Sequence, residues 1–272
     1  ATAPNRHKKN MIGLSKTNAV VTNACGWRGP ILNGSSTASR RSKVVFVPPD
    51  AASAIRYASH VTRISADYLA LTAYRESAFR SSIAARKSSA VGMYQFIEQT
   101  WLGLLYKNGN CLGLGHLTKH IYVGSGGRYF VRNRSAKRKI LSLRKQQKLS
   151  AVLAGRLAQL NAKIFSNARG RTPTIGELYT AHFLGAVGAA KLSKLRSERP
   201  NAPAKRFFSR AAHANPSIFY DRKRPRTVAE VFDELVRKHV GVRVEFGGRA
   251  GRQRSSNPGF IDRLHHFVFT SS

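Results

Sequence analysis

Apolar residues recur at helical spacing through much of the chain. Over 51–64 they stand three residues apart, which predicts an amphipathic helix. A second helix is expected over 66–79, with Ser65 as a candidate N-cap residue. A third begins near Ile97, and a fourth lies around 150–165. The pattern therefore predicts a mainly helical core.

Two capping signatures mark later helix starts. In each, a threonine stands three residues before a glutamate, as Thr174 before Glu177 and Thr227 before Glu230. The threonine hydroxyl can accept the amide hydrogen at the third helical position, while the glutamate reaches back to the amide of the threonine. These pairs predict one helix over 175–186 and another that starts after Thr227.

The pattern divides the chain into a folded centre and two basic ends. Residues 1–43 contain eight Lys or Arg and no acid, which is typical of a basic flexible arm, and 241–272 resembles a basic C-terminal tail. The domain between them, 44–240, is expected to be mainly α, with strand signal only at 44–47. Its segment 123–149 is dense in Arg and Lys and predicts a solvated insertion. No apolar run approaches the ~18 residues of a membrane-spanning helix.

Net charge points to an anionic partner. The chain has 47 Lys and Arg against 12 Asp and Glu, a formal net charge of +35. A field of this size favours association with polyanions. Nucleic acid, acidic cell-envelope polymers and anionic membrane surfaces all satisfy it, so charge alone does not choose among them.

Cysteine and histidine give no sign of a metal site. The two cysteines, Cys25 and Cys111, exclude a Cys-based zinc site. They could form one disulfide in an oxidising compartment or remain two free thiols. The nine histidines form no ligand-like cluster beyond the adjacent His265 and His266. No metal is expected.

The scarcity of carboxylates narrows the search for an acid or base, since none occurs in 99–176. Glu76 lies deep within a predicted helix, on the same face as Leu69 and Ala73. Apolar surroundings disfavour the charged carboxylate, raise its pKa and let it donate a proton near neutral pH. Spacing alone leaves open the alternative of a surface ion pair with a neighbouring arginine.

The motifs around Glu76 resemble those of the transglycosylase SLT family. Glu-Ser-Ala-Phe at 76–79 is followed, at the family's spacing, by Gly-Met-Tyr-Gln-Phe at 92–96 and Thr-Trp at 100–101. A second block, Tyr-Thr-Ala-His-Phe-Leu-Gly at 179–185, stands where most members carry Ala-Tyr-Asn-x-Gly. This form is similar to a subgroup found in giant-phage endolysins and some exported bacterial enzymes. The resemblance covers roughly 50–240.

The resemblance implies a lysozyme-like helical fold, of the goose-type lysozyme/SLT kind, that cuts the β-1,4 bond between N-acetylmuramic acid and N-acetylglucosamine. Glu76 would protonate the leaving oxygen. It would then take the proton from the muramic C6 hydroxyl, which attacks C1 and closes a 1,6-anhydro ring. Hydrolysis by two carboxylates normally needs a second Asp or Glu as the nucleophile or as the base for water. No obvious second carboxylate accompanies Glu76. No cofactor is implied.

Supporting residues near the first motif also carry over from the resemblance. Ser77 and Gln95 would line the sugar-binding cleft. Gly92 and Met93 would let the backbone approach the substrate. Trp101 is expected in the core.

The second motif supplies the opposite wall of the expected cleft. Tyr179 and His182 share one helix face. Tyr179 would hydrogen-bond or orient Glu76, and His182 takes the place of the family's usual Tyr. Phe183 departs from the family's Asn, so an amide contact is lost or supplied elsewhere. Tyr220 would close the far end of the cleft.

Three alternatives stay open: a hydrolytic lysozyme on the same fold, a silent wall-binding module, and a basic nucleic-acid- or envelope-binding protein. The resemblance implies peptidoglycan glycan strands as the partner of a monomer, with adventitious binding of nucleic acid and the basic ends on anionic envelope surfaces. The start Ala-Thr-Ala-Pro, with no leader, is typical of a processed protein that is exported to the periplasm or cell wall, and a phage lysin also fits.

Overall fold

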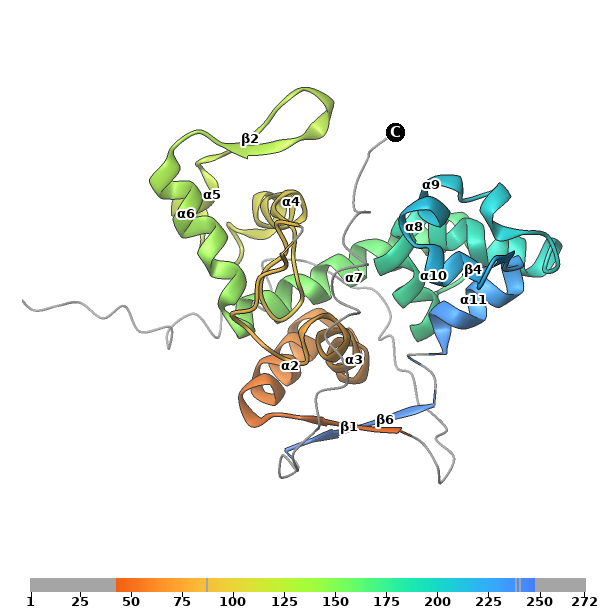
Figure 1. Cartoon of the computed structure of the whole chain (residues 1–272). Helices are drawn as coiled ribbons and strands as arrows, with labels where there is room; N and C mark the ends of the chain where they lie inside the picture. Colours follow the sequence, from red (N-terminus) through yellow and green to blue (C-terminus); the bar gives the residue numbers. More distant parts are fainter. Residues whose placement is uncertain (1–42, 87, 238, 240, 248–272) are drawn as a thin grey trace, which may run out of the picture.

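The computed structural model describes residues 43–247, apart from 87, 238 and 240. This part of the chain is mainly α, as the sequence predicts (Figure 1). The helices are α2 (Pro49–Thr62), α3 (Ala66–Ser77), α4 (Glu98–Asn108), α5 (Gly115–Thr118), α6 (Arg134–Ser142), α7 (Gln147–Arg169), α8 (Ile175–Glu198), α9 (Ser209–Ala214), α10 (Pro216–Phe219) and α11 (Val228–Val236). The strands are β1 (Lys43–Val47), β2 (Ile121–Val123), β3 (Tyr129–Val131), β4 (Tyr220–Asp221), β5 (Arg224–Pro225) and β6 (Val242–Phe246). Three short 3-10 turns lie between these elements: η2 (Ser125–Gly127), η3 (Leu143–Lys145) and η4 (Ala204–Arg206).

Helix α7 lies at the centre of the molecule. It packs along α2 and against α8, and Figure 1 shows it running between the lobe of α2–α6 and the lobe of α8–α11. Small residues on α7 allow this close packing: Ala151, Ala158 and Ala162 are buried between larger neighbours. One core cluster covers α2, α3, α4 and most of α7, and a second joins α8 to α9, α10 and α11.

The sequence predicts a solvated insertion over 123–149. This prediction is wrong for the side chains of the segment that are buried against the core. Strands β2 and β3 pair there as an antiparallel hairpin, and α6 follows. Ile140 is fully buried, and its carbonyl accepts the indole N–H of Trp101 at 2.8 Å. Trp101 is in the core, as expected. The basic residues hid the amphipathic pattern of α6 because they occupy only its outer face.

A second correction concerns 241–272. Strand β6, which starts at Val242, pairs in parallel with β1, with Val45 opposite Val244. The folded part therefore continues beyond residue 240. A strand of five residues with an alternating Arg and Glu gives little local signal, and its pairing partner stands about 200 residues earlier, which sequence pattern cannot reveal. The arm proposed for 1–43 lies outside the described residues except for Lys43, as do 248–272 and Cys25. Cys111 is disulfide-bonded.

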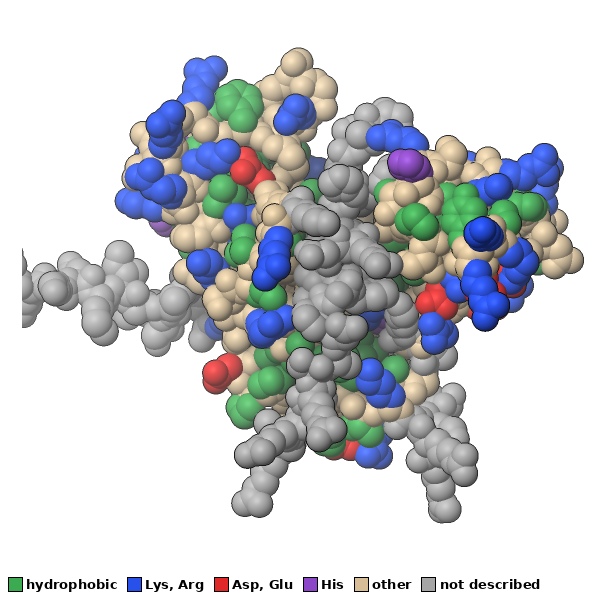
Figure 2. Space-filling view, in the orientation of Figure 1, with side chains coloured by type: hydrophobic (Ala, Val, Ile, Leu, Met, Phe, Trp, Pro, Cys, Tyr) green, Lys and Arg blue, Asp and Glu red, His purple; other side chains and the backbone are tan. Residues whose placement is uncertain are grey.

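The described surface is strongly cationic. Figure 2 shows Lys and Arg side chains over both lobes, with few acids between them. In the described part of the chain, none of the helices has the length and apolar character needed to cross a membrane.

Candidate functional site

Glu76 faces His182 across the junction of α3 and α8. Its carboxylate Oε1 lies 3.0 Å from His182 Nε2, and only 6% of the Glu76 side chain is exposed against 25% for the histidine. Apolar residues of α3 bury the acid, as its position beside Leu69 and Ala73 predicts. Burial excludes the surface location of the alternative that spacing left open, although the neighbouring Arg75 does interact electrostatically with this carboxylate. A proton can lie on either side of this contact, since a neutral imidazole nitrogen can donate or accept.

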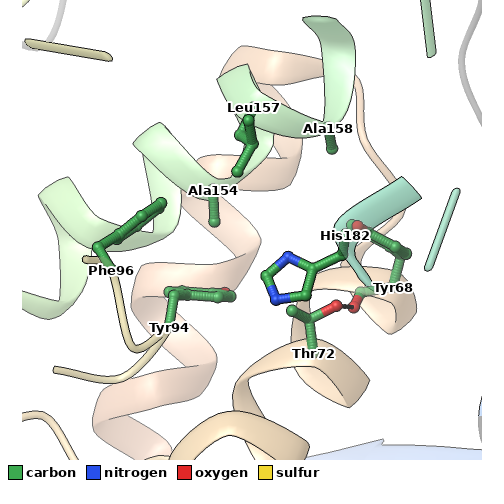
Figure 3. Close-up of a pocket in the computed structure, with 8 residues that line it drawn as sticks. All are labelled: Tyr68, Thr72, Tyr94, Phe96, Ala154, Leu157, Ala158 and His182. Atoms are coloured by element: carbon green, nitrogen blue, oxygen red, sulfur yellow. Dashed lines mark hydrogen bonds between the residues drawn. The ribbon is translucent and has the colours of Figure 1, made fainter. Parts of the chain in front are cut away.

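His182 also points into a small pocket of about 10 Å³, roughly the space of one water molecule, between α3, α7 and the 94–96 turn. Figure 3 shows its imidazole between Tyr94 on one side and Tyr68 and Thr72 on the other, with side chains of α7 above. The apolar part of the lining is Phe96, Ala154, Leu157 and Ala158. The Tyr94 hydroxyl is buried with no hydrogen-bond partner. A buried polar atom of this kind costs free energy unless a partner satisfies it, and the pocket has room for about one water molecule.

Behind this pair, aromatic and cationic side chains form a stack. The Tyr179 ring lies between His182, with centroids 6.0 Å apart, and His239, at 4.0 Å. The Arg75 guanidinium lies 3.7 Å above the Tyr179 ring, and its Nη1 is 3.1 Å from His239 Nδ1. Tyr179 was expected to hydrogen-bond or orient Glu76. The structure places the Tyr179 ring beside His182, the residue that bonds to Glu76.

Ser77, Met93 and Gln95, which were predicted near the sugar-binding cleft, are not among the residues that line this small pocket. Ser77 and Met93 are fully buried, and the Ser77 hydroxyl donates to the Met93 carbonyl at 2.8 Å. The Gln95 amide donates to the Gly92 carbonyl at 2.9 Å and to Ile83 at 3.2 Å. These residues tie the 92–95 turn to the end of α3. They hold Tyr94 in place and leave ligand contact to it.

Gly92 fits the expectation of a close backbone approach, but the partner differs. Its φ is +90°, and a Cβ there would lie 2.2 Å from the carbonyl oxygen of Arg144. Arg144, itself buried, donates through Nη1 to the carbonyls of Ser89 and Phe96. The glycine therefore lets the turn pack against the basic segment.

Unusual backbone conformations gather around the same turn. Ala78 and Phe79, directly after Glu76-Ser77, have positive φ values of 49° and 65°, and Gln95 has 47°. Non-glycine residues rarely adopt this region, and such strain concentrates at functional sites. The segments 76–79 and 92–96 of the SLT-like pattern thus contain three of the five non-glycine residues with positive φ in the described part of the chain.

Helix α8 changes direction just after His182. Gly185 has φ 73° and ψ 161°, a conformation open almost only to glycine, and it interrupts the helix. Val187 beyond it is 72% exposed. The helix predicted over 175–186 ends close to this break. The observed helix continues beyond the break to Glu198.

Tyr220 lies away from the Glu76 group. It is half-buried in β4, packs against the core cluster of α8–α11, and has Lys205 5.7 Å from its ring centroid. Phe183, which stands where the family has Asn, is buried in the same cluster. Tyr220 therefore supports the second lobe, and the expectation that it closes the cleft finds no contact in its favour.

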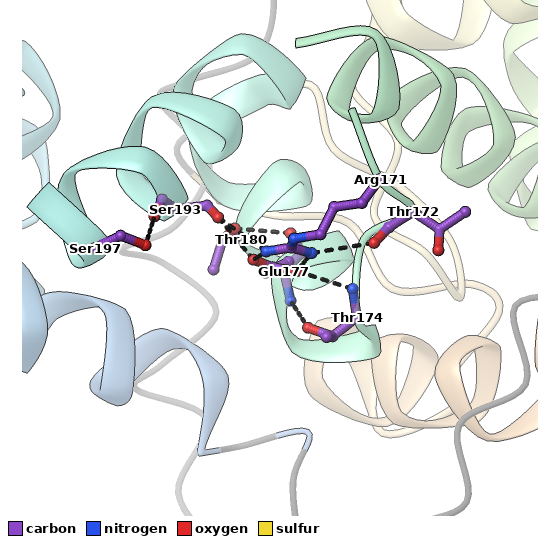
Figure 4. A network of polar contacts seen from close by, with 7 residues as sticks. All are labelled: Arg171, Thr172, Thr174, Glu177, Thr180, Ser193 and Ser197. Carbon is purple, nitrogen blue, oxygen red and sulfur yellow. Dashed lines mark hydrogen bonds and ion pairs between the residues drawn. The ribbon is translucent and has the colours of Figure 1, made fainter. Parts of the chain in front are cut away.

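Glu177 fixes the start of the helix that carries His182. It is 3% exposed and completes the capping box with Thr174 that the sequence predicts. Figure 4 shows its carboxylate between Arg171 and Ser193. Arg171 binds both oxygens, at 2.8 and 2.6 Å, and Ser193 donates at 2.8 Å. Although burial opposes it, this bonding lowers the pKa of Glu177 to about 2.

Glu177→Gln is expected to lower the free energy of unfolding by about 2 kcal/mol at neutral pH. The lowered pKa corresponds to about 3 kcal/mol, discounted because solvent screens the half-exposed Arg171. The stabilisation is complete above the unfolded pKa of 4.5 and is lost as pH falls toward 2. Urea unfolding at neutral pH and at pH values below 4.5 measures both. Glu230→Gln, the matched capping box on the surface, should change stability far less; equal losses would contradict the argument.

His239 gives a separate dependence on pH. Burial, with Arg75 and His182 nearby, lowers its pKa well below the usual 6.5, so the folded state holds the neutral ring. The unfolded chain binds more protons below pH 6.5. Stability is therefore full above that value and falls with pH until the folded pKa is reached. Between neutral and mildly acid pH, the melting temperature of the wild type should fall by more than that of His239→Gln. The exposed His213→Gln serves as control, and parallel curves for wild type and His239→Gln would refute the prediction.

Four residues of this site were not predicted from the sequence: Tyr68, Thr72, Tyr94 and His239. Thr72 stands one helical turn before Glu76, and Tyr94 lies inside the quoted Gly-Met-Tyr-Gln motif, so both signals were present. No signal in the sequence pointed to His239, because only the return of the chain after α11 brings this residue to α3. In the described ranges, no group of three or more His, Cys, Asp or Glu could hold a metal ion. No known protein-family model matches the chain.

Proposed function

We propose that this chain is a peptidoglycan lytic transglycosylase of lysozyme-like fold, with Glu76 as its general acid and base. The observation that carries the proposal is the buried Glu76 carboxylate, bonded to His182 at the edge of a pocket that contains an unsatisfied tyrosine hydroxyl. The motif resemblance to the SLT family supports the same assignment from sequence.

The distribution of carboxylates favours Glu76 over any other acid. Among the described Asp and Glu residues, only Glu76 and Glu177 are buried. Glu177 is held by Arg171 and two further donors, and its low pKa keeps it ionised. The other described acids lie in first turns of helices or in surface pairs with Lys or Arg. Proton transfer thus falls to Glu76.

A mechanism follows from the proposed role and the contacts of Glu76. The protonated carboxyl donates to the glycosidic oxygen as the bond to C1 breaks. The resulting carboxylate accepts the proton of the muramic C6 hydroxyl as that oxygen bonds to C1. His182 holds Oε1 through both steps, so the other carboxyl oxygen keeps its orientation toward the bond.

One experiment tests both the activity and its class. Purified peptidoglycan is digested with the full chain, and the soluble products are examined by mass spectrometry. Products lighter by one water, about 18 Da, than hydrolysis products indicate anhydro-ring closure and support the proposal. Reducing-end products would assign a hydrolytic lysozyme on the same site. No products at all would reject the enzyme and favour the alternative of a basic binding protein.

A further inference from the structure

Exposed apolar and cationic side chains come together on the β2–β3 hairpin. Tyr122 and Val123 are 42% and 47% exposed, among the few large hydrophobic residues so exposed in the described chain. The hairpin projects from the upper edge of its lobe in Figure 1, away from α2 and α3. The proposed reaction makes no use of it.

The two faces of the hairpin are both apolar near its tip. Side chains alternate along a strand, so Tyr122 and Phe130, paired across the ribbon, share one face, where their rings stack 5.7 Å apart. Arg132 follows on that face, 5.1 Å from the Tyr122 ring. Val123 and Tyr129 are paired on the opposite face. The tip between the strands is Gly-Ser-Gly-Gly-Arg at 124–128, with Arg128 as its one charged residue.

Cations lie along the hairpin and the adjoining helix α6 almost without acids. The sequence from 99 to 176 has no Asp or Glu, and the nearby Glu98 is paired with Lys137 at 2.6 Å. Figure 2 shows the cluster of Lys and Arg on this lobe, with apolar atoms between them. The exposed members are Arg128, Arg132, Arg134, Arg138 and Lys139.

We propose that the hairpin patch, defined as Tyr122, Val123, Phe130 and these five cations, binds an anionic lipid surface with its tip in the headgroup region. Aromatic and aliphatic side chains gain by entering the interface, and the cations beside them pair with lipid phosphates. A nucleic acid or glycan strand would contact one face of the ribbon. A lipid interface surrounds the tip, which fits apolar side chains on both faces, and an aliphatic Val123 has no ring on which a base or sugar could stack.

The test places a reporter at the tip, because the basic ends of the full chain could also bind vesicles. Val123→Trp is mixed with vesicles of phosphatidylglycerol and phosphatidylethanolamine at physiological ionic strength. Its emission, after subtraction of the wild-type spectrum, should shift to the blue and be quenched by brominated lipid. Val187→Trp, at a position that is 72% exposed against 47% for Val123 but lies outside the patch, should stay unchanged. Phosphatidylcholine vesicles should leave both unchanged.

Charge variants complete the test. A triple replacement within the patch should weaken the vesicle-dependent shift of Val123→Trp on the order of tenfold or more, since each basic residue near an anionic surface contributes about fivefold. A control triple removes the same charge elsewhere and should have little effect. The patch triple is Arg134→Gln, Arg138→Gln and Lys139→Gln, and the control triple is Lys163→Gln, Arg199→Gln and Lys223→Gln.

Two results would overturn the proposal. In the first, the protein sediments with anionic vesicles while Val123→Trp keeps a water-exposed spectrum, which assigns binding to another surface. In the second, a single-stranded oligonucleotide changes the emission of Val123→Trp and vesicles do not, which assigns the patch to nucleic acid.

Discussion

Glu76→Gln is expected to lower the rate of peptidoglycan cleavage by about 10²–10⁴-fold, the usual loss when a general acid and base is removed. Glutamine has nearly the same shape, and its amide can still bond to His182, so the pocket should keep its form. Only the transferable proton is lost. The release of soluble muropeptides from purified peptidoglycan measures the effect.

A surface acid provides the matched control for this variant. Glu198→Gln, whose side chain is 53% exposed near the end of α8, removes the same charge without touching the pocket and should retain wild-type activity. Both variants should melt within a few degrees of wild type. Activity in Glu76→Gln close to that of wild type would remove Glu76 from the proposed mechanism.

Gly92→Ala should lower the free energy of unfolding by about 3 kcal/mol. Two costs combine: a positive φ of 90° that alanine avoids, and a Cβ 2.2 Å from the Arg144 carbonyl oxygen. That oxygen belongs to the backbone and cannot rotate away. The melting temperature should fall by roughly 6–12 °C. Activity should fall as well, since the turn holds Tyr94 in the pocket.

Gly126→Ala separates the two costs. Its φ is +69°, but nothing lies within 4 Å of the added Cβ. It should therefore lose only the conformational part, about 1 kcal/mol. If both alanine variants lose the same stability, the contact with Arg144 contributes nothing and the packing argument is wrong.

Local sequence determined the helices and the position of the acid. Periodic apolar residues predicted α2, α3, α4 and α7 to within a few residues, and the Thr-x-x-Glu pairs fixed the starts of α8 and α11, because capping depends on residues three apart. Burial of Glu76 followed from its place on the apolar face of α3. These features depend on neighbours within one or two turns, which sequence pattern contains.

Tertiary structure decided the rest of the site. It brought His182 to Glu76 over a separation of 106 residues, and it brought His239 to Arg75 over 164. It also used Ser77 and Gln95 to fix a turn, and it paired β6 with β1. Such contacts depend on how α7 directs the second lobe against the first. The pairing of distant surfaces leaves no periodic trace along the chain, so only the packed molecule determines it.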